Sequence, residues 1–207
     1  MELTWANRIT ISRILLILPF IIFMVKASEP EHAVLMRYLA LAVFVIMSIS
    51  DVLDGYVARL KKEVTKLGAF LDPMADKLLM LCSCLLFSAE STAVENFRLP
   101  VTVVVLIIGK DVFLALGFLT MYMMVTTDIK IRPVMFGKSA TFLQLMMVMT
   151  ILVGPEMMEV WPGWWYVPRV IWWTATTVAV VTVLIYIRTG AKYVQQVEAS
   201  PDTDDSK

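Results

Sequence analysis

The sequence has little charge and no long polar half. Charged residues make up 17% of its 207 residues, whereas soluble globular domains carry roughly one quarter. The formal net charge is zero, so the composition gives no indication of a nucleic-acid partner, and we expect none. The length alone would allow one or two soluble domains, but the scarcity of charge argues against that class of protein.

Cysteine is also scarce. The two cysteines, Cys82 and Cys84, lie in the apolar stretch LMLCSCLLF, and residues two positions apart do not share a helix face. We interpret them as small apolar packing residues, with a metal-binding or redox pair as the alternative. Neither interpretation identifies a redox compartment.

Apolar residues, in contrast, are abundant and occur in long runs. They make up 59% of the sequence, and several runs approach the roughly 20 residues that a helix needs to cross a bilayer. Strand-type alternation does not recur, and backbone polar groups must be satisfied within the segment in lipid. The sequence therefore predicts an all-α integral membrane bundle of six transmembrane helices. The expected spans are Thr10–Val25, Ala33–Arg59, Gly68–Ser88, Val101–Met124, Gly137–Val153 and Val167–Ile187.

The two ends of the chain differ from these spans. The N-terminal segment begins with acidic and polar residues and lacks a basic start. We therefore interpret it as a short amphipathic segment before a retained first span, with cleavage at Ala27–Ser28 as the alternative. The acidic, polar C-terminal end is typical of a disordered tail. We expect a membrane domain over 1–193 and a tail over 194–207.

Lysine and arginine in the short loops predict the orientation of the helices. Alternate connections are basic, whereas the others, SEPEH, AESTAVENF and GPEMMEVWPGWWY, are mostly acidic or neutral. Six spans would place both termini in the cytoplasm, and the aromatic cluster around 161–166 suits the outer membrane interface. The basic positions on the cytoplasmic side are Arg8, Arg13, Arg59, Lys61, Lys62, Lys66, Lys130, Arg132, Lys138, Arg188 and Lys192.

Four aspartates gather within DVLDGYVARLKKEVTKLGAFLDPMAD, residues 51–76. Asp51 and Asp54 are three positions apart, and Asp72 and Asp76 are four apart, so each pair shares one helix face. Two antiparallel neighbouring helices would bring the pairs together near the cytoplasmic surface. Each charge would cost roughly 2.5–3.5 kcal/mol at the bilayer centre, so the carboxylates need neutralising partners.

Two kinds of partner would serve. Oxygen ligands in this number suit two divalent cations such as Mg²⁺ or Mn²⁺, which commonly assist phosphate chemistry. Salt bridges to Arg59, Lys77 and Lys110 are the alternative.

The whole stretch resembles the signature of the CDP-alcohol phosphotransferase family. It fits the pattern D-x2-D-G-x2-A-R-x8-G-x3-D-x3-D at every fixed position. The resemblance implies a bundle of six transmembrane helices in which Asp51, Asp54, Asp72 and Asp76 bind two divalent cations. It also implies that Asp76 is the general base toward the acceptor alcohol. The residues that it assigns to the cytidine diphosphate part of the donor are Gly55, Ala58, Arg59 and Gly68.

Other segments resemble the branch of the family whose acceptor is glycerol 3-phosphate. ANRITISR, with Asn7, Thr10 and Arg13, matches an N-x2-T-x2-R opening, and GAFLDPMADKLL and GKSATFLQ, with Lys138, are similar to elements of that branch. Helix capping would explain Asn7 equally well. One departure is Lys110, because relatives often carry arginine before the acid there; Lys110 can hold a phosphate as a point charge or bridge to Asp111.

The resemblance implies transfer of a phosphatidyl group from CDP-diacylglycerol to sn-glycerol 3-phosphate, giving phosphatidylglycerol phosphate and CMP. The enzyme would lie in a bacterial inner membrane with its active site facing the cytoplasm, and a homodimer is suggested. A CMP-forming cardiolipin synthase that uses phosphatidylglycerol as acceptor is the alternative. A metal-ion transporter is the alternative from a different class, because carboxylates within a membrane also mark ion paths.

Overall fold

A computed structural model describes residues 5–61, 66–124 and 135–198, and the side chains of 10–51, 74–117 and 139–191. Within these ranges the chain is helical and contains no strand, which confirms the all-α prediction. The elements are α1 (Trp5–Lys26), α2 (Ala33–Lys61), α3 (Lys66–Ser88), α4 (Val101–Met124), α5 (Met135–Leu152), α6 (Gly154–Val160), the 3₁₀ turn η1 (Pro162–Trp165) and α7 (Tyr166–Glu198).

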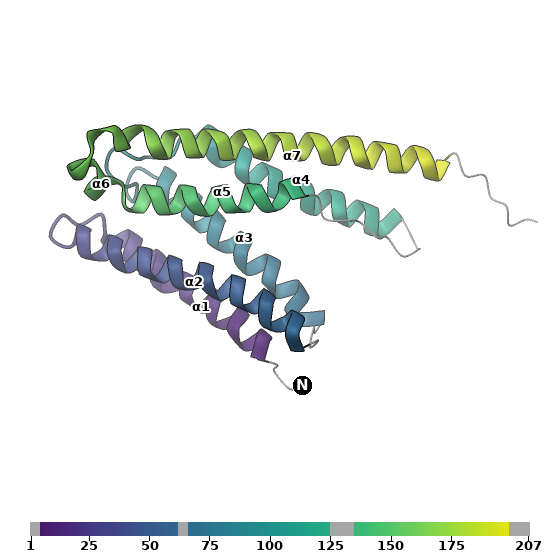
Figure 1. Ribbon diagram of the computed structural model, residues 1–207, viewed down its shortest axis with the longest axis horizontal. Helices are drawn as coiled ribbons and strands as arrows, with labels where there is room; N and C mark the ends of the chain where they lie inside the picture. Colours follow the sequence, from purple (N-terminus) through teal and green to yellow (C-terminus); the bar gives the residue numbers. More distant parts are fainter. Residues whose placement is uncertain (1–4, 62–65, 125–134, 199–207) are drawn as a thin grey trace, which may run out of the picture.

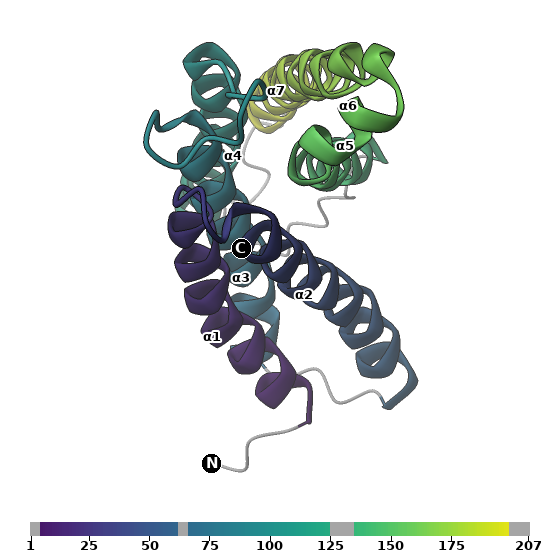
Figure 2. The same ribbon diagram turned by 90° about the vertical axis from the view of Figure 1, so that its left-hand side faces the viewer.

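The long helices form two groups of three. Helix α1 packs against α2 and α3, and α7 packs against α4 and α5 (Figures 1 and 2). Smaller contacts of α3 with α4 and of α2 with α5 join the groups. Helix α6 and the connections α1–α2 and α3–α4 lie at one end of the bundle, which we call the α6 end. The starts of α1 and α3 and the end of α2 lie at the opposite end, which we call the N-terminal end (Figure 1).

Apolar side chains at helical spacing hold the first group together. Phe20 of α1 and Phe44 of α2 are fully buried, with ring centroids 6.0 Å apart. Burying one such side chain contributes roughly 1.5–3 kcal/mol. The neighbouring buried positions fall three or four residues away on the same faces: Ile17, Met24, Ala40 and Met47.

Small residues allow close packing of α7. Ala175 and Ala179 are fully buried one turn apart, and small residues let membrane helices approach closely. Thr176 and Thr182 are also buried there, and their hydroxyls donate to the carbonyl oxygens of Trp172 and Val178 at 2.7 Å. The hydroxyls therefore remain hydrogen-bonded inside the apolar bundle.

The outer faces of the helices are apolar, as expected for contact with lipid. Leu15, Leu18, Val105, Leu116 and Leu184 are among many large apolar side chains that are exposed. By length and composition, the segments 33–51 and 162–191 can each cross a membrane in the described part of the chain, and the bent pair 139–152 and 154–160 would make a third span. These features identify a membrane protein.

A break separates α5 from α6. The two helices are bent by 65°, and Pro155 in the first turn of α6 cannot continue the hydrogen-bond ladder of α5. Gly154 is required there because a Cβ at this position would lie 2.5 Å from the Phe97 ring. The sequence GPEMMEVWPGWWY was expected to be a loop, and that was wrong, because it forms α6 and η1.

Arg169 fastens the start of α7 to the α3–α4 connection. Its guanidinium donates to the Trp165 carbonyl at 2.6 Å and to the Asn96 carbonyl at 3.1 Å. The guanidinium carbon also lies 3.4 Å from the centroid of the Trp165 ring, an arrangement favourable for a cation–π contact. Asn96 has a φ of 63°, a conformation that asparagine tolerates well. This contact, which we call the Arg169 clip, belongs to the α6 end.

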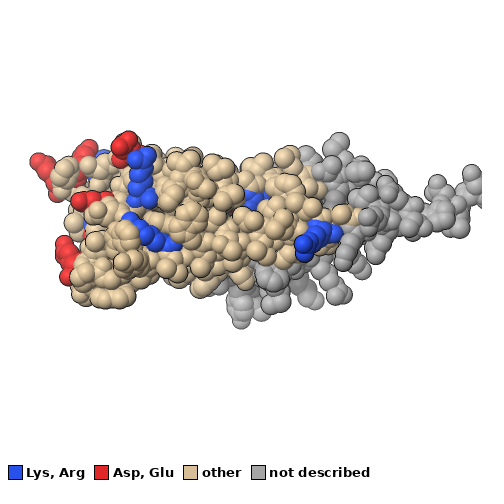
Figure 3. All heavy atoms as spheres, turned by 90° about the horizontal axis from the view of Figure 1, so that it is seen from above, with Lys and Arg blue, Asp and Glu red and all other residues tan. Residues whose placement is uncertain are grey.

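The six predicted helices are present, with differences at their ends. The residues from Trp5 onward form the first turns of α1, so they are no separate amphipathic element. Helix α7 continues to Glu198, beyond the expected end at Ile187 and into the segment interpreted as a tail. Figure 3 shows acidic side chains gathered at the α6 end.

Candidate active site

Asp51 and Asp76 lie at matching depths in α2 and α3. Asp51 precedes the end of α2 at Lys61 by ten residues, and Asp76 follows the start of α3 at Lys66 by ten residues. At 1.5 Å per residue, each lies about 15 Å along its helix from the N-terminal end. The two carboxylates are close enough to act electrostatically on each other. Helix α1 packs against both α2 and α3, so the first and last aspartates of the motif lie in helices that share one neighbour.

Helix α1 supplies the cation nearest to Asp51. Arg13 Nη1 donates to Asp51 Oδ1 at 2.6 Å. The Arg13 side chain is only 2% exposed, whereas that of Asp51 is 48% exposed. The charge of Arg13 also acts on Asp76. Arg13 thus lies at the buried base of the carboxylate pair, in the helix that packs against both α2 and α3.

The donor set fits divalent cations as far as it is described. The exposed carboxylate of Asp51 and the nearby carboxylate of Asp76 are hard oxygen ligands, which suit Mg²⁺ and Mn²⁺. Asp54 and Asp72 occupy helical positions on the same faces as these two, but their side chains lie outside the described residues. Among the side chains that are described, no three potential metal ligands come together. The metal-site prediction therefore depends on both halves of the motif.

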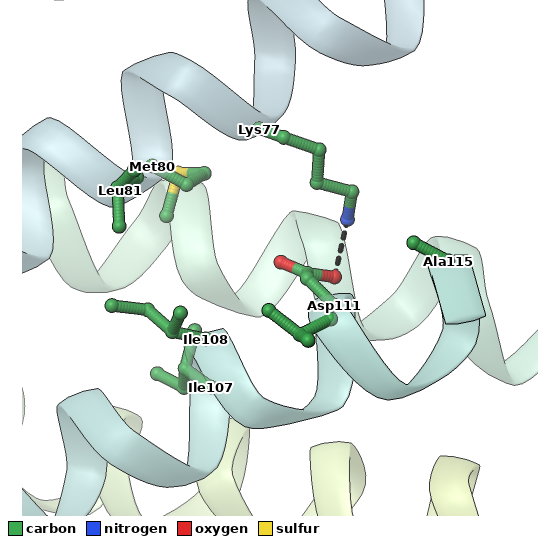
Figure 4. A pocket seen from close by; sticks show the side chains of 8 residues that line it. Lys77, Met80, Leu81, Ile107, Ile108, Asp111 and Ala115 are labelled. Carbon is green, nitrogen blue, oxygen red and sulfur yellow. Dashed lines mark hydrogen bonds and ion pairs between the residues drawn. The ribbon is translucent and has the colours of Figure 1, made fainter.

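A second charged cluster joins α3 to α4. Asp111 Oδ1 accepts from Lys77 Nζ at 2.5 Å (Figure 4), and it lies 3.1 Å from Lys110 Nζ. Lys110 is 3% exposed and Asp111 is 16% exposed, whereas Lys77 is 44% exposed. The charges of Asp111 and Lys77 both act on Asp76. Two cations and one acid therefore border the carboxylate pair on the α4 side.

A mostly apolar groove lies beside this cluster. It has a volume of about 230 Å³, and Figure 4 shows the Lys77–Asp111 ion pair next to the apolar side chains of α3 and α4. The residues that line it are Lys77, Met80, Leu81, Ile107, Ile108, Asp111, Val112 and Ala115.

The remaining predicted site residues occupy the same helices. Thr10 is 1% exposed, one turn before Arg13 in α1. Asn7 lies in the first turns of α1, and Lys138 lies near the start of α5. The side chains of Asn7 and Lys138 lie outside the described residues, as do those of Gly55, Ala58 and Arg59 in α2 and Gly68 in α3.

The alternative to a metal site was that Arg59, Lys77 and Lys110 form salt bridges with the motif aspartates. For Lys77 and Lys110, whose side chains are described, this was wrong. Lys77 and Lys110 both pair with Asp111, not with an aspartate of the motif. Among the side chains that the structure describes, the cation that pairs with a motif aspartate is Arg13, to which the sequence assigned no site role. The available signal was an arginine directly before the apolar run of α1, because a charge within a membrane helix requires an internal partner.

Comparisons with known proteins identify the same family that the aspartate motif resembles. The CDP-alcohol phosphatidyltransferase family matches residues 3–184. A Rickettsia bellii (strain RML369-C) protein named CDP-diacylglycerol–glycerol-3-phosphate 3-phosphatidyltransferase is 31% identical over 190 residues, which are 90% of this chain and 95% of that protein. Proteins with the same name from Bacillus subtilis (strain 168) and Rickettsia typhi (strain ATCC VR-144 / Wilmington) are 34% and 30% identical, over 71% and 90% of this chain and 75% and 97% of their own lengths.

Proposed function

Since the chain belongs to the CDP-alcohol phosphatidyltransferase family, we propose that Asp51 and Asp76 mark one active site enclosed by α1, α2 and α3. The enzyme transfers a phosphatidyl group from CDP-diacylglycerol to sn-glycerol 3-phosphate and releases CMP. The observation that carries this assignment is the placing of both carboxylates at one depth, within electrostatic range of each other. A shared name among relatives that span most of this chain supports the acceptor.

The motif aspartates divide the work of catalysis. Asp51, Asp54, Asp72 and Asp76 hold two divalent cations, Mg²⁺ or Mn²⁺. Bound there, the cations supply positive charge that offsets the pyrophosphate and favours departure of CMP. The Asp76 carboxylate takes the proton from the attacking hydroxyl of the acceptor. That oxygen forms a bond to the phosphorus that carries diacylglycerol, and the bond from that phosphorus to the CMP oxygen breaks.

The donor lies between the helices of the first group. Gly55, Ala58 and Gly68 have little or no side chain, so the phosphates of the donor can approach the backbone. Arg59 pairs with those phosphates, and Asn7 and Thr10 border the same space from α1. The two acyl chains remain in the bilayer against the apolar outer faces of the bundle.

The acceptor phosphate requires cations on the other side of Asp76. Lys138 of α5 and Lys110 of α4 are the proposed partners. Lys110 is already close to Asp76 electrostatically, and its pairing with Asp111 holds the ammonium in place. The Lys77–Asp111 contact leaves this three-residue cluster with one net positive charge, which favours an anionic acceptor.

The active site faces the cytoplasm of a bacterium, in its inner membrane. Six helices cross the bilayer and place both termini on the cytoplasmic side. The lysines and arginines of the alternate connections support this orientation, because basic residues are favoured on the cytoplasmic side. We also propose that the protein forms a homodimer.

A direct assay tests the acceptor. Membranes that contain this chain are supplied with CDP-diacylglycerol and labelled glycerol 3-phosphate, and we expect labelled phosphatidylglycerol phosphate together with CMP. Membranes that carry the Asp76→Asn variant serve as the control. The absence of that product, with cardiolipin formed from phosphatidylglycerol instead, would identify the cardiolipin synthase alternative.

A further inference from the structure

Arg13 is the buried cation of the first helix group. It donates to Asp51 at 2.6 Å and acts on Asp76 electrostatically, and its helix packs against both helices that carry these acids. We propose that Arg13 is a positioning residue that fixes the orientation of the Asp51 carboxylate for a divalent cation. This role rests on the proposed function, and it adds a residue of α1 to the metal-binding part of the site, which the aspartate motif otherwise forms.

The two side chains differ in burial in the way this role requires. The Arg13 side chain is 2% exposed, so its contact lies on the inner side of Asp51, whereas the Asp51 side chain is 48% exposed. A carboxylate has two oxygens, and Arg13 engages Oδ1. Fixing one oxygen from the inside limits rotation of the carboxylate and directs it toward the open side. Partners that orient metal ligands in this way commonly contribute a factor of roughly 10–100 to metal affinity or activity.

Charge gives Arg13 a second effect. Asp51 and Asp76 repel each other, and the cation at their base offsets part of that repulsion. An arginine inside a membrane bundle is costly by itself, so the aspartates and Arg13 stabilise one another. Arg13 therefore allows α2 and α3 to keep their acids close before a cation binds.

The alternative is that Arg13 merely joins α1 to α2. The chain offers a matched control for that alternative in Arg37 of α2, which donates to Glu156 of α6. Arg37 is 11% exposed and Glu156 is 19% exposed, so this too is a buried ion pair between helices. Arg37 and Asp51 are 14 residues apart in α2, which at 1.5 Å per residue is about 21 Å along the helix.

The experiment measures Mn²⁺ binding to the purified full chain in detergent micelles without donor or acceptor. Free Mn²⁺ is followed by electron paramagnetic resonance for the wild type and for the Arg13→Gln, Arg13→Lys and Arg37→Gln variants. We expect Arg13→Gln to bind Mn²⁺ roughly 10–100-fold more weakly. Arg13→Lys should recover part of the affinity, because an ammonium can hold one oxygen. Arg37→Gln should lower thermal stability and leave the affinity unchanged.

The Asp51→Asn background tests whether Arg13 acts through Asp51. On that background, adding Arg13→Gln should change the affinity by no more than about twofold, since the two residues then act as one unit. Wild-type affinity or tighter binding in folded Arg13→Gln would overturn the role, and so would equal losses in Arg13→Gln and Arg37→Gln. A wild type that makes phosphatidylglycerol phosphate without binding Mn²⁺ would also overturn it, while leaving the acceptor assignment intact.

Discussion

In the charged cluster of Lys77, Lys110 and Asp111, we expect loss of the acid to destabilise the protein far more than loss of either cation. Asp111→Asn should destabilise the protein by about 3 kcal/mol, the lower end of the range for removing one partner of a buried pair. The reason is that Lys110, 3% exposed, would keep its charge after losing the carboxylate that lies 3.1 Å from its ammonium. The lower end applies because the amide oxygen of asparagine can still accept a hydrogen bond from the ammonium.

Removing either cation should cost much less. Lys110→Met replaces a buried ammonium with an apolar side chain of similar length, while Asp111 keeps Lys77 at 2.5 Å. The expected change is below about 1 kcal/mol, because the buried ammonium is removed and Asp111 still has a cation beside it, so no uncompensated buried charge is left. Lys77 is 44% exposed, so Lys77→Gln should cost roughly 0.2–1 kcal/mol.

The assay is equilibrium unfolding in mixed micelles with rising amounts of sodium dodecyl sulfate, followed by circular dichroism. The predicted order of destabilisation is Asp111→Asn well above Lys77→Gln and Lys110→Met. Equal losses for Asp111→Asn and Lys110→Met would refute the argument, because they would show that the pair acts only as a mutual contact. The KM of the Lys110→Met protein for glycerol 3-phosphate can be measured separately. If Lys110 binds the acceptor, this KM should rise while the stability stays unchanged.

Three further outcomes are expected. Treatment with EDTA should abolish transferase activity and added Mg²⁺ or Mn²⁺ should restore it; full activity in the chelator would contradict the metal site. Asp76→Asn should bind CDP-diacylglycerol but lower kcat by roughly 10²–10⁴-fold, the usual contribution of a general base, and near-normal turnover would remove that role from Asp76. Gly154→Ala should destabilise the protein by roughly 1–3 kcal/mol through overpacking against Phe97, as measured by the same unfolding assay; an unchanged midpoint would mean that the break between α5 and α6 accommodates a methyl group.

The long helices could be predicted because their causes are local. Apolar runs of membrane length and the requirement for internal backbone hydrogen bonds predict α2 to α5 to within two residues at each end. Helix α1 starts five residues earlier than expected and α7 ends eleven residues later, because a helix can continue past its apolar run. Residues 51, 54, 72 and 76 all lie in helices, as the spacing argument assumed. That the two pairs meet stays a prediction, which depended on one further step, the antiparallel return of the chain.

What could not be predicted depends on contacts between distant residues. Arg13 and Asp51 are 38 positions apart, and the residues around Arg13 do not indicate which acid it contacts. Lys77 and Lys110 could have served the motif aspartates, but the packing of α3 against α4 gives both to Asp111. At the α6 end, the fifth span was expected to end at Val153 and α5 ends at Leu152, but α6 and η1 form where a loop was expected.

The Arg169 clip has a consequence for spectroscopy. Five of the six tryptophans lie between 161 and 173, and the Arg169 guanidinium carbon is 3.4 Å from the Trp165 ring centroid and 5.5 Å from that of Trp172. The intrinsic fluorescence of the protein is therefore dominated by the end opposite the aspartates. Unfolding of the α6 end can therefore be followed by tryptophan emission alone. Changes around Asp51 should alter the emission only through Trp5.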